Sequence, residues 1–175
     1  MKQSESSRFT VAQGEIEIQP AALAETAVVA AILREAAIWL EQRGMALWQT
    51  SAFEPEHLMP DVADGQYMLA RWHGLPAGVF KYQREDPLIW PDALPGEAAY
   101  IHRVAIRRSY AGSELSAVLL QAAAARARRE GCRYLRLDCE SSRPRLREIY
   151  TRCGFLYHSD YVACPYHVAR YQLLL

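Results

Sequence analysis

The stretch Tyr100–Ser116, YIHRVAIRRSYAGSELS, decides the fold. Its first half is β-prone and predicts a strand, a turn occupies residues 107–112, and apolar residues recur at helical spacing from Ser113 onward. A helix that begins at such a turn leaves its first backbone N–H groups without partners inside the helix. These groups point outward with the positive end of the helix dipole, and the small residues of the turn let a ligand approach closely. The stretch therefore predicts a diphosphate-binding turn.

Outward from this stretch, the hydrophobic pattern predicts alternating strands and helices in the order β, α, β, β, β, α, β, α, β, β. Strand–helix–strand units around the turn imply parallel pairing with a right-handed crossover, whereas the hairpin before them implies antiparallel pairing. The simplest arrangement is a mixed sheet with helices on both faces. The predicted elements are strands at 15–19, 66–72, 77–82, 97–106, 133–139, 155–157 and 168–174, and helices at 22–43, 113–130 and from Pro144 to about 153.

The bulk composition is typical of one packed domain. The chain has 175 residues, about half of them apolar, and a formal net charge of zero. We expect residues 1–14 to form a flexible tail and residues 15–175 a single domain. A neutral chain shows no global attraction to nucleic acid, and no stretch has the roughly 18 consecutive apolar residues of a membrane span. We therefore expect neither a nucleic-acid nor a membrane partner.

Cysteine and histidine spacing gives no sign of a metal site. The four cysteines form no CxxC pair, and the five histidines are scattered along the chain. In the absence of a secretory signal, these cysteines are expected to be reduced thiols in a cytoplasmic protein. The residues concerned are Cys132, Cys139, Cys153 and Cys164, and His57, His73, His102, His158 and His167.

Charge is distributed unevenly around the predicted turn. Residues 101–153 carry twelve arginines and five acidic residues, a balance of +7, which leaves −7 for the rest of the neutral chain. A basic region beside an amide-rich turn suits a small polyanionic ligand. For any single arginine, a solvated place on a helix face is an equally good interpretation.

Two stretches resemble the GNAT superfamily of acyl-CoA-dependent N-acyltransferases. YIHRVAIRRSYAGSELSAVLL, from Tyr100, resembles the acyl-CoA-binding motif, and LRLDCESSRPRLREIYTRCGF, from Leu135, is similar to the family's closing helix that ends in Tyr-x-x-x-Gly-Phe. The resemblance implies an α/β (α+β) fold with a mixed, mostly antiparallel central sheet, a splayed parallel strand pair and helices on both faces. It also implies that acetyl-CoA is the co-substrate, without a metal, and leaves a homodimer open.

The resemblance assigns cofactor contacts to the Tyr100–Ser116 stretch. The backbone of three residues at the strand end would bind the pantetheine arm and polarise the thioester carbonyl, while the turn and first helical residues would bind the diphosphate. The chain departs from the family pattern at Ala111, at Glu114 and at Arg143, where the family has a basic residue, a glycine and an asparagine. Arg107 or Arg108 could supply the missing charge, and Arg143 could reach a phosphate. The expected cofactor-binding residues are Val104, Ala105, Ile106, Arg107, Arg108, Ala111, Gly112, Ser113, Glu114, Leu115, Ser116 and Arg143.

Glu114 is the departure with a physical cost. A carboxylate about 4 Å from a diphosphate is repelled by on the order of 1 kcal/mol in water and by more in a cleft. Its side chain must therefore point away, be paired by an arginine, or weaken binding. This feature and Ala111 favour an alternative in which the chain is a non-catalytic acyl-CoA-binding or regulatory module.

Two residues are candidates for the chemistry of acyl transfer. Tyr150 resembles the family's general acid for the leaving thiolate, and a phenol is a suitable donor. His102 shares a face of its strand with Val104 and is the candidate base. Both could instead be buried structural residues, and Glu85 or Asp86 could serve as bases through water.

The resemblance thus implies an N-acetyltransferase that moves an acetyl group from acetyl-CoA to a primary amine of a small molecule or peptide, by direct attack in a ternary complex. A nucleic-acid binder that uses the arginine-rich segment Ala125–Arg136 is a weaker interpretation, because its single aromatic residue, Tyr134, does not give the interleaving with arginines that stacking on successive bases requires.

Overall fold

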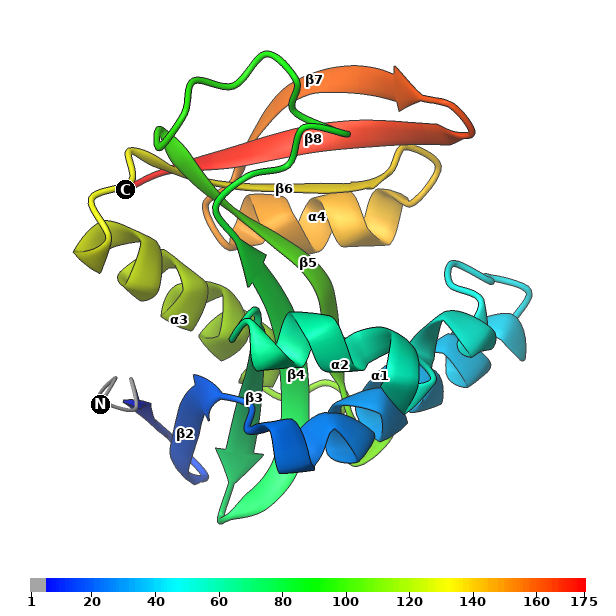
Figure 1. Cartoon of the computed structure of the whole chain (residues 1–175), viewed down its shortest axis with the longest axis vertical. Helices are drawn as coiled ribbons and strands as arrows, with labels where there is room; N and C mark the ends of the chain where they lie inside the picture. The colour runs from blue at the N-terminus through cyan, green and yellow to red at the C-terminus, as the bar shows by residue number, and fades with distance from the viewer. Residues whose placement is uncertain (1–5) are drawn as a thin grey trace. The chain divides into compact units, whose positions relative to one another are not determined.

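The computed structural model describes residues 6–175, and in this part of the chain eight strands form one sheet in the order β1-β2-β3-β4-β5-β6-β8-β7 (Figure 1). The strands are β1 (Ser7–Val11), β2 (Gly14–Pro20), β3 (Tyr67–Trp72), β4 (Leu75–Gln83), β5 (Ala98–Ile106), β6 (Tyr134–Glu140), β7 (Leu156–Ala163) and β8 (Tyr166–Leu174). The helices are α1 (Thr26–Glu41), α2 (Pro55–Ala63), α3 (Leu115–Arg129) and α4 (Pro144–Arg152).

The sheet is mixed, as the sequence predicts. The pairs β1–β2, β2–β3, β3–β4, β6–β8 and β7–β8 are antiparallel, and β5–β6 is parallel. A parallel pair needs a long crossover, which α3 supplies between β5 and β6. The paired register of β5 and β6 covers only Ala98–Tyr100 and Tyr134–Arg136, although both strands continue beyond these residues. The mixed α/β fold with a mostly antiparallel sheet is confirmed.

The described chain divides into two compact units. The first contains the residues up to Lys81 together with Arg103–Leu119, and the second contains Tyr82–His102 together with Leu120–Leu175. The predicted organisation of residues 15–175 as a single domain stays a prediction.

The core of the first unit forms between α1, α2 and strands β3 and β4. Val29, Ile32 and Leu33 lie three and four residues apart, so they share the face of α1 that is fully buried. They belong to the same apolar cluster as Leu58 of α2 and Leu69 of β3. Each such side chain stabilises the fold by about 1.5–3 kcal/mol through burial.

In the second unit, other segments pack against both faces of strand β8. Successive side chains of a strand point to opposite faces. Tyr171 lies 6.0 Å, ring to ring, from Tyr150 of α4, whereas the guanidinium of Arg170 lies 4.6 Å from the ring of Trp90. Trp90 belongs to the segment 84–97 between β4 and β5, so α4 and this segment cover opposite faces of β8.

Two predicted boundaries in the N-terminal part of the chain need correction. Residues 7–11, expected to lie in a flexible tail, form β1 and pair with Gly14–Ile18 of β2. The strand was missed because neither of its faces is fully buried, so it shows no clear hydrophobic alternation. The helix expected from residue 22 begins at Thr26, because Leu23–Glu25 forms a 3-10 turn in which the Glu25 carboxylate accepts the Ala22 amide at 2.9 Å. Residues 1–5 of the expected tail lie outside the described residues.

The helices of the described residues were compared with the length and apolar character of a membrane span. Among residues 6–175, no helix combines the length and the apolar character that a bilayer span requires.

Candidate active site

The turn between β5 and α3 has several backbone N–H groups directed away from internal acceptors. The hydroxyl of Ser113 accepts the amide of Leu115 at 3.3 Å and donates to the carbonyl of Tyr110 at 2.7 Å, which fixes the start of α3. Within residues 6–175, the amides of Gly112, Glu114 and Ser116 have no hydrogen-bond acceptor. Such amides at a helix start are suited to binding an anion.

The side chains around this turn are open to solvent, apart from one anchor. Leu115 is fully buried and holds the first turn of α3, while Ala111, Gly112 and Glu114 are exposed. Gly112 has a φ of 80°, a conformation that residues with a side chain rarely adopt. Glu114 makes no ion pair with any described residue. The effect of this exposed carboxylate on a bound diphosphate stays a prediction.

Arg107 and Arg108 are bound to α1 in the first unit. A single carboxylate, that of Glu35, accepts from Nη1 of Arg107 at 2.9 Å and from the amide of Arg108 at 2.6 Å. The guanidinium of Arg108 lies 3.9 Å from the ring of Trp39. The charge of Arg107 is therefore offset by the carboxylate of Glu35. These two arginines would attract a phosphate less strongly than two arginines without a carboxylate partner.

Strand β5 carries a conformational irregularity just before the predicted pantetheine-binding residues Val104, Ala105 and Ile106. Arg103 has a φ of 54°, which is uncommon for a residue with a side chain. Its guanidinium donates to the phenol oxygen of Tyr67 at 2.7 Å. On the neighbouring strand, a Cβ at Gly78 would lie 3.1 Å from the carbonyl oxygen of Ala105, so glycine allows the two backbones to approach closely there.

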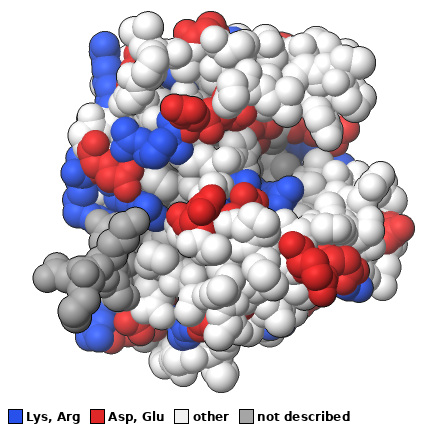
Figure 2. All heavy atoms as spheres, viewed as in Figure 1, with Lys and Arg blue, Asp and Glu red and all other residues white. Residues whose placement is uncertain are grey.

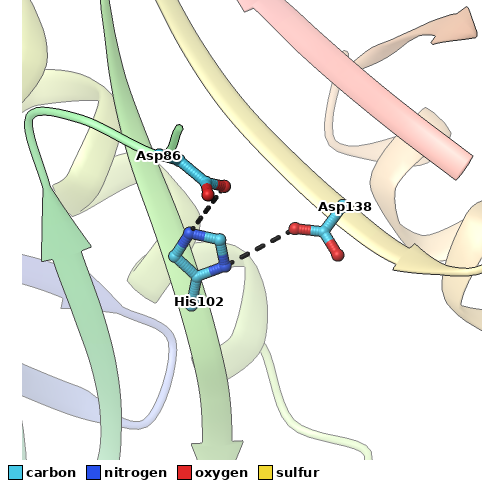
Figure 3. A group of neighbouring side chains, drawn as sticks. All are labelled: Asp86, His102 and Asp138. Carbon is cyan, nitrogen blue, oxygen red and sulfur yellow. Dashed lines mark ion pairs between the residues drawn. The ribbon is translucent and has the colours of Figure 1, made fainter. Parts of the chain in front are cut away.

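His102 lies between two carboxylates in the second unit (Figure 3). Its Nε2 is 3.2 Å from Oδ2 of Asp86, and its Nδ1 is 3.5 Å from Oδ1 of Asp138. His102 and Asp138 each follow the last paired positions of β5 and β6, Tyr100 and Arg136, by two residues. Because side chains two residues apart share a face of a strand, the parallel register brings these two together.

The electrostatics of Asp138 are dominated by its burial. Burial raises the pKa of Asp138, and the nearby Asp86 raises it further, while His102 acts in the opposite direction. Oδ2 of Asp86 and Oδ1 of Asp138 are both buried and, among residues 6–175, have no hydrogen-bond partner beyond their contacts with the ring. Each carboxylate faces a different ring nitrogen, whereas the donors of a bound metal ion converge on one point about 2 Å away. The arrangement therefore suits hydrogen bonds from the ring to the two carboxylates.

Tyr150 projects from α4 into aromatic surroundings in the second unit. Its ring lies 6.2 Å from that of Phe155 and 6.0 Å from that of Tyr171. Burial raises its pKa well above the usual range, and the neighbouring Cys139 and Asp138 add to this effect. A phenol in these surroundings stays protonated at neutral pH, and the same shift makes it a weaker acid than an exposed phenol.

Arg143, which replaces the family's asparagine, precedes α4 as its N-cap residue. Its Nε donates to the carboxylate of Glu140 at 2.7 Å, and this pairing lowers the pKa of Glu140. The predicted phosphate contact of Arg143 stays a prediction.

Sequence reasoning missed Asp138 as a member of the site. The alternation in β6 places it on one face with Tyr134 and Arg136, but a polar residue on a strand face is usually solvated. The signal that could have found it is the strand register: in parallel pairing, the residue beside His102 is two positions after Arg136. The sequence offers Asp86 as an alternative base to His102, and the structure places its carboxylate 3.2 Å from Nε2 of His102.

The charged residues on the visible face do not form a single basic field. Figure 2 shows Lys and Arg side chains beside Asp and Glu side chains on this face. A nucleic-acid surface would instead present a continuous basic patch.

Comparison with known proteins places the chain in a family. Residues 31–155 match the model of the acetyltransferase (GNAT) family. An uncharacterized N-acetyltransferase of Bacillus subtilis (strain 168), YesJ, is 28% identical over 147 residues, which cover 78% of this chain and 79% of that protein.

Solved structures share the fold. A GNAT-family acetyltransferase from Listeria monocytogenes 4b F2365 superimposes with a TM-score of 0.81 at 23% identity, over 97% of this chain and 100% of that chain. The PaiA N-acetyltransferase of Thermoplasma acidophilum, crystallised with coenzyme A, gives a TM-score of 0.72 at 13% identity, over 91% of this chain and 99% of that chain. The family match spans well over half of the sequence, and the chain therefore belongs to the GNAT family of acetyltransferases.

Proposed function

We propose that the chain is an N-acetyltransferase that moves an acetyl group from acetyl-CoA to a primary amine of a small molecule or peptide, by direct attack in a ternary complex. The family match supports acetyl transfer, and the fold is shared with a protein crystallised with coenzyme A. The single observation that supports amine chemistry in this chain is the position of His102 between Asp86 and Asp138.

His102 acts in this proposal as the general base. An amine is protonated near neutral pH and must lose a proton before its electron pair can attack the thioester carbonyl. Once the proton is on the ring, the imidazolium faces carboxylates at both nitrogens, 3.2 and 3.5 Å away. Both carboxylates lie where they can accept a hydrogen bond from an N–H group of that imidazolium.

Tyr150 acts as the general acid. The thiolate of coenzyme A leaves as the tetrahedral intermediate collapses, and it is a better leaving group when protonated. The raised pKa of Tyr150 keeps its proton in place until the thiolate forms. The phenol therefore has a proton to give over the whole neutral range.

The turn before α3 binds the diphosphate in this proposal. Its unpartnered amides at Gly112, Glu114 and Ser116 supply donors that do not depend on side chains. The exposed carboxylate of Glu114 opposes the anion but can remain in solvent. We therefore expect acetyl-CoA to bind, with an affinity reduced by this one charge.

The test is a screen of primary amines with acetyl-CoA and a free-thiol readout. The proposal predicts thiol release above the amine-free rate with at least one amine, and a mass increase of one acetyl group on that amine. Binding of acetyl-CoA by calorimetry without transfer to any amine would instead support a non-catalytic binding module. The homodimer and the cytoplasmic location stay predictions, which analytical ultracentrifugation and cell fractionation would test.

A further inference from the structure

The two carboxylate oxygens of Asp86 have different partners. Oδ1 accepts the amide of Ile89 at 3.2 Å, and the main-chain carbonyl of Asp86 accepts the amide of Trp90 at 2.8 Å. Oδ2 is buried and faces Nε2 of His102 at 3.2 Å, and only 9% of the side chain is exposed. Rotation of the carboxylate would break its bond to Ile89, so the orientation of Oδ2 toward the ring is fixed.

The segment that carries Asp86 is itself held firmly on the sheet. Trp90 is 3% exposed, and its ring centre lies 4.7 Å from the guanidinium of Arg136 and 4.6 Å from that of Arg170. Arg170 also donates to the carbonyl of Ile89 at 3.2 Å and to the carboxylate of Asp92 at 2.8 Å. These contacts anchor residues 89–92 and, through them, the turn that begins at Asp86.

A fixed carboxylate decides which nitrogen of the ring carries the proton. An ionised carboxylate only accepts hydrogen bonds, and a neutral ring can donate to only one of the two carboxylates that face it. Asp86 is the nearer, at 3.2 Å against 3.5 Å for Asp138, and its orientation is held by Ile89, so Nε2 is the nitrogen that donates. A neutral imidazole has a single N–H, and the hydrogen bond made by one nitrogen therefore determines the state of the other. We propose that Asp86 is a positioning residue that fixes neutral His102 with its proton on Nε2, so that Nδ1 is the atom that accepts the amine proton. This inference rests on the proposed function for its catalytic part only.

Asp138 completes the arrangement on the Nδ1 side. In the step itself, an N–H bond of the ammonium group breaks, its proton moves to Nδ1, and the electron pair stays on the amine nitrogen for attack on the thioester. The new Nδ1–H then faces Oδ1 of Asp138, 3.5 Å from Nδ1 before the proton arrives. Asp86 thus sets the resting state of the ring, and Asp138 stabilises the state that the reaction creates.

Nitrogen NMR of the ¹⁵N-labelled full chain distinguishes the two neutral forms of the ring directly, with the His102 signals assigned by their loss in His102→Gln. Wild type should show the Nε2–H form. In Asp86→Asn, the amide oxygen must still accept from Ile89, so the NH₂ group faces Nε2 and donates to it. The variant should therefore shift His102 to the Nδ1–H form, and kcat should fall about tenfold or more while KM for acetyl-CoA stays within about twofold.

Two further variants make the comparison specific. Asp138→Asn leaves Asp86 in place and should keep the Nε2–H form. Asp64→Asn makes the same chemical change at an exposed carboxylate at the end of α2 and should alter neither the spectrum nor kcat.

Several results would overturn the proposal. An Nδ1–H form in the wild type would do so, as would a ring that remains doubly protonated at alkaline pH, because such a ring cannot accept another proton. These two observations need only the wild type, so they hold even if Asp86→Asn does not fold. An unchanged kcat in a variant whose ring has changed form would also contradict it. If the ring forms are as predicted but no amine is acetylated, the positioning role of Asp86 stands and the proposed function fails.

Discussion

Arg103 donates a hydrogen bond of 2.7 Å to the phenol oxygen of the fully buried Tyr67, from a backbone position with a φ of 54° inside strand β5. The guanidinium also lies 5.4 Å from the ring centre of Phe53. The left-handed conformation costs a residue with a side chain roughly 1–2 kcal/mol, so these contacts hold the strand in a shape it would not adopt unaided. The irregularity directly precedes the predicted pantetheine-binding residues Val104–Ile106.

Arg103→Gly and Arg103→Ala should therefore reverse the usual order of stability. In an ordinary strand, glycine is the less stable of the two by about 0.5–1 kcal/mol. At this position both variants lose the contacts with Tyr67 and Phe53, but only glycine is free of the strain. We expect the glycine variant to be the more stable by about 1 kcal/mol in urea unfolding. An alanine variant as stable as the glycine variant, or more so, would show that the backbone conformation is not strained.

Glu114→Gln should strengthen acetyl-CoA binding. The exposed carboxylate lies in the turn whose amides are predicted to bind the diphosphate, so its removal takes away a repulsion between like charges. We expect an increase in affinity of about two- to fivefold in calorimetry at low salt, and a smaller one at high salt because ions screen exposed charges. An affinity that does not change at low salt would place the diphosphate elsewhere.

Tyr150→Phe should lower kcat by about a hundredfold and leave the acetyl-CoA dissociation constant nearly unchanged. Because burial, with Cys139 and Asp138, raises the pKa of Tyr150, its phenol remains protonated from neutral to mildly alkaline pH. The ratio of wild-type to variant kcat should then be constant between about pH 7 and pH 9, below the ordinary phenol pKa. A ratio that declines over this range would mean that the phenol loses its proton early, and equal activity would remove Tyr150 as the acid.

Glu130→Gln should destabilise the fold at neutral pH but not in acid. Burial alone would raise the pKa of Glu130, but hydrogen bonds from Arg126, Arg84 and Tyr82 together outweigh it and hold the pKa below its usual value. A depressed pKa means that this carboxylate stabilises the fold above its unfolded pKa and ceases to do so as the pH falls through its folded pKa. We expect a loss of on the order of 1–3 kcal/mol in the free energy of unfolding at pH 7, and less near pH 3.

Glu148→Gln is the matched control for this prediction. It removes an exposed ion pair with Arg152 on α4 and should change the free energy of unfolding by no more than about 0.5 kcal/mol. A loss at Glu130 that is equally large in acid would indicate that packing, and not the ionised carboxylate, stabilises this site.

The fold could be predicted in large part because its elements carry strong local signals. The strand–turn–helix at Tyr100–Ser116 and the Pro144 start of α4 both depend on neighbouring residues alone. Strand β1 carried no such signal, since its residues alternate between half-buried and exposed and its pairing with β2 stabilises it. Helix starts were displaced by two to four residues where a 3-10 turn or a serine cap precedes the helix.

The candidate site was only partly predictable, for a different reason. His102 could be selected from its residue type and its strand, but its partners are 16 and 36 positions away in the sequence and meet it only through the tertiary fold. The pairing of Arg107 with Glu35 was equally hidden, because it joins the turn to a helix 72 positions earlier. Local patterns carry no information on such contacts, so the arginines could not be assigned to a phosphate or to a carboxylate in advance.

The proposed chemistry depends on His102 removing the proton of the attacking amine. The most direct test compares the rate of acetyl-CoA-dependent thiol release by the wild type and by His102→Gln, with an amine that the wild type acetylates. The account predicts that the substitution lowers kcat by about a hundredfold or more while acetyl-CoA still binds in calorimetry. A variant that acetylates the same amine at the wild-type rate would contradict it.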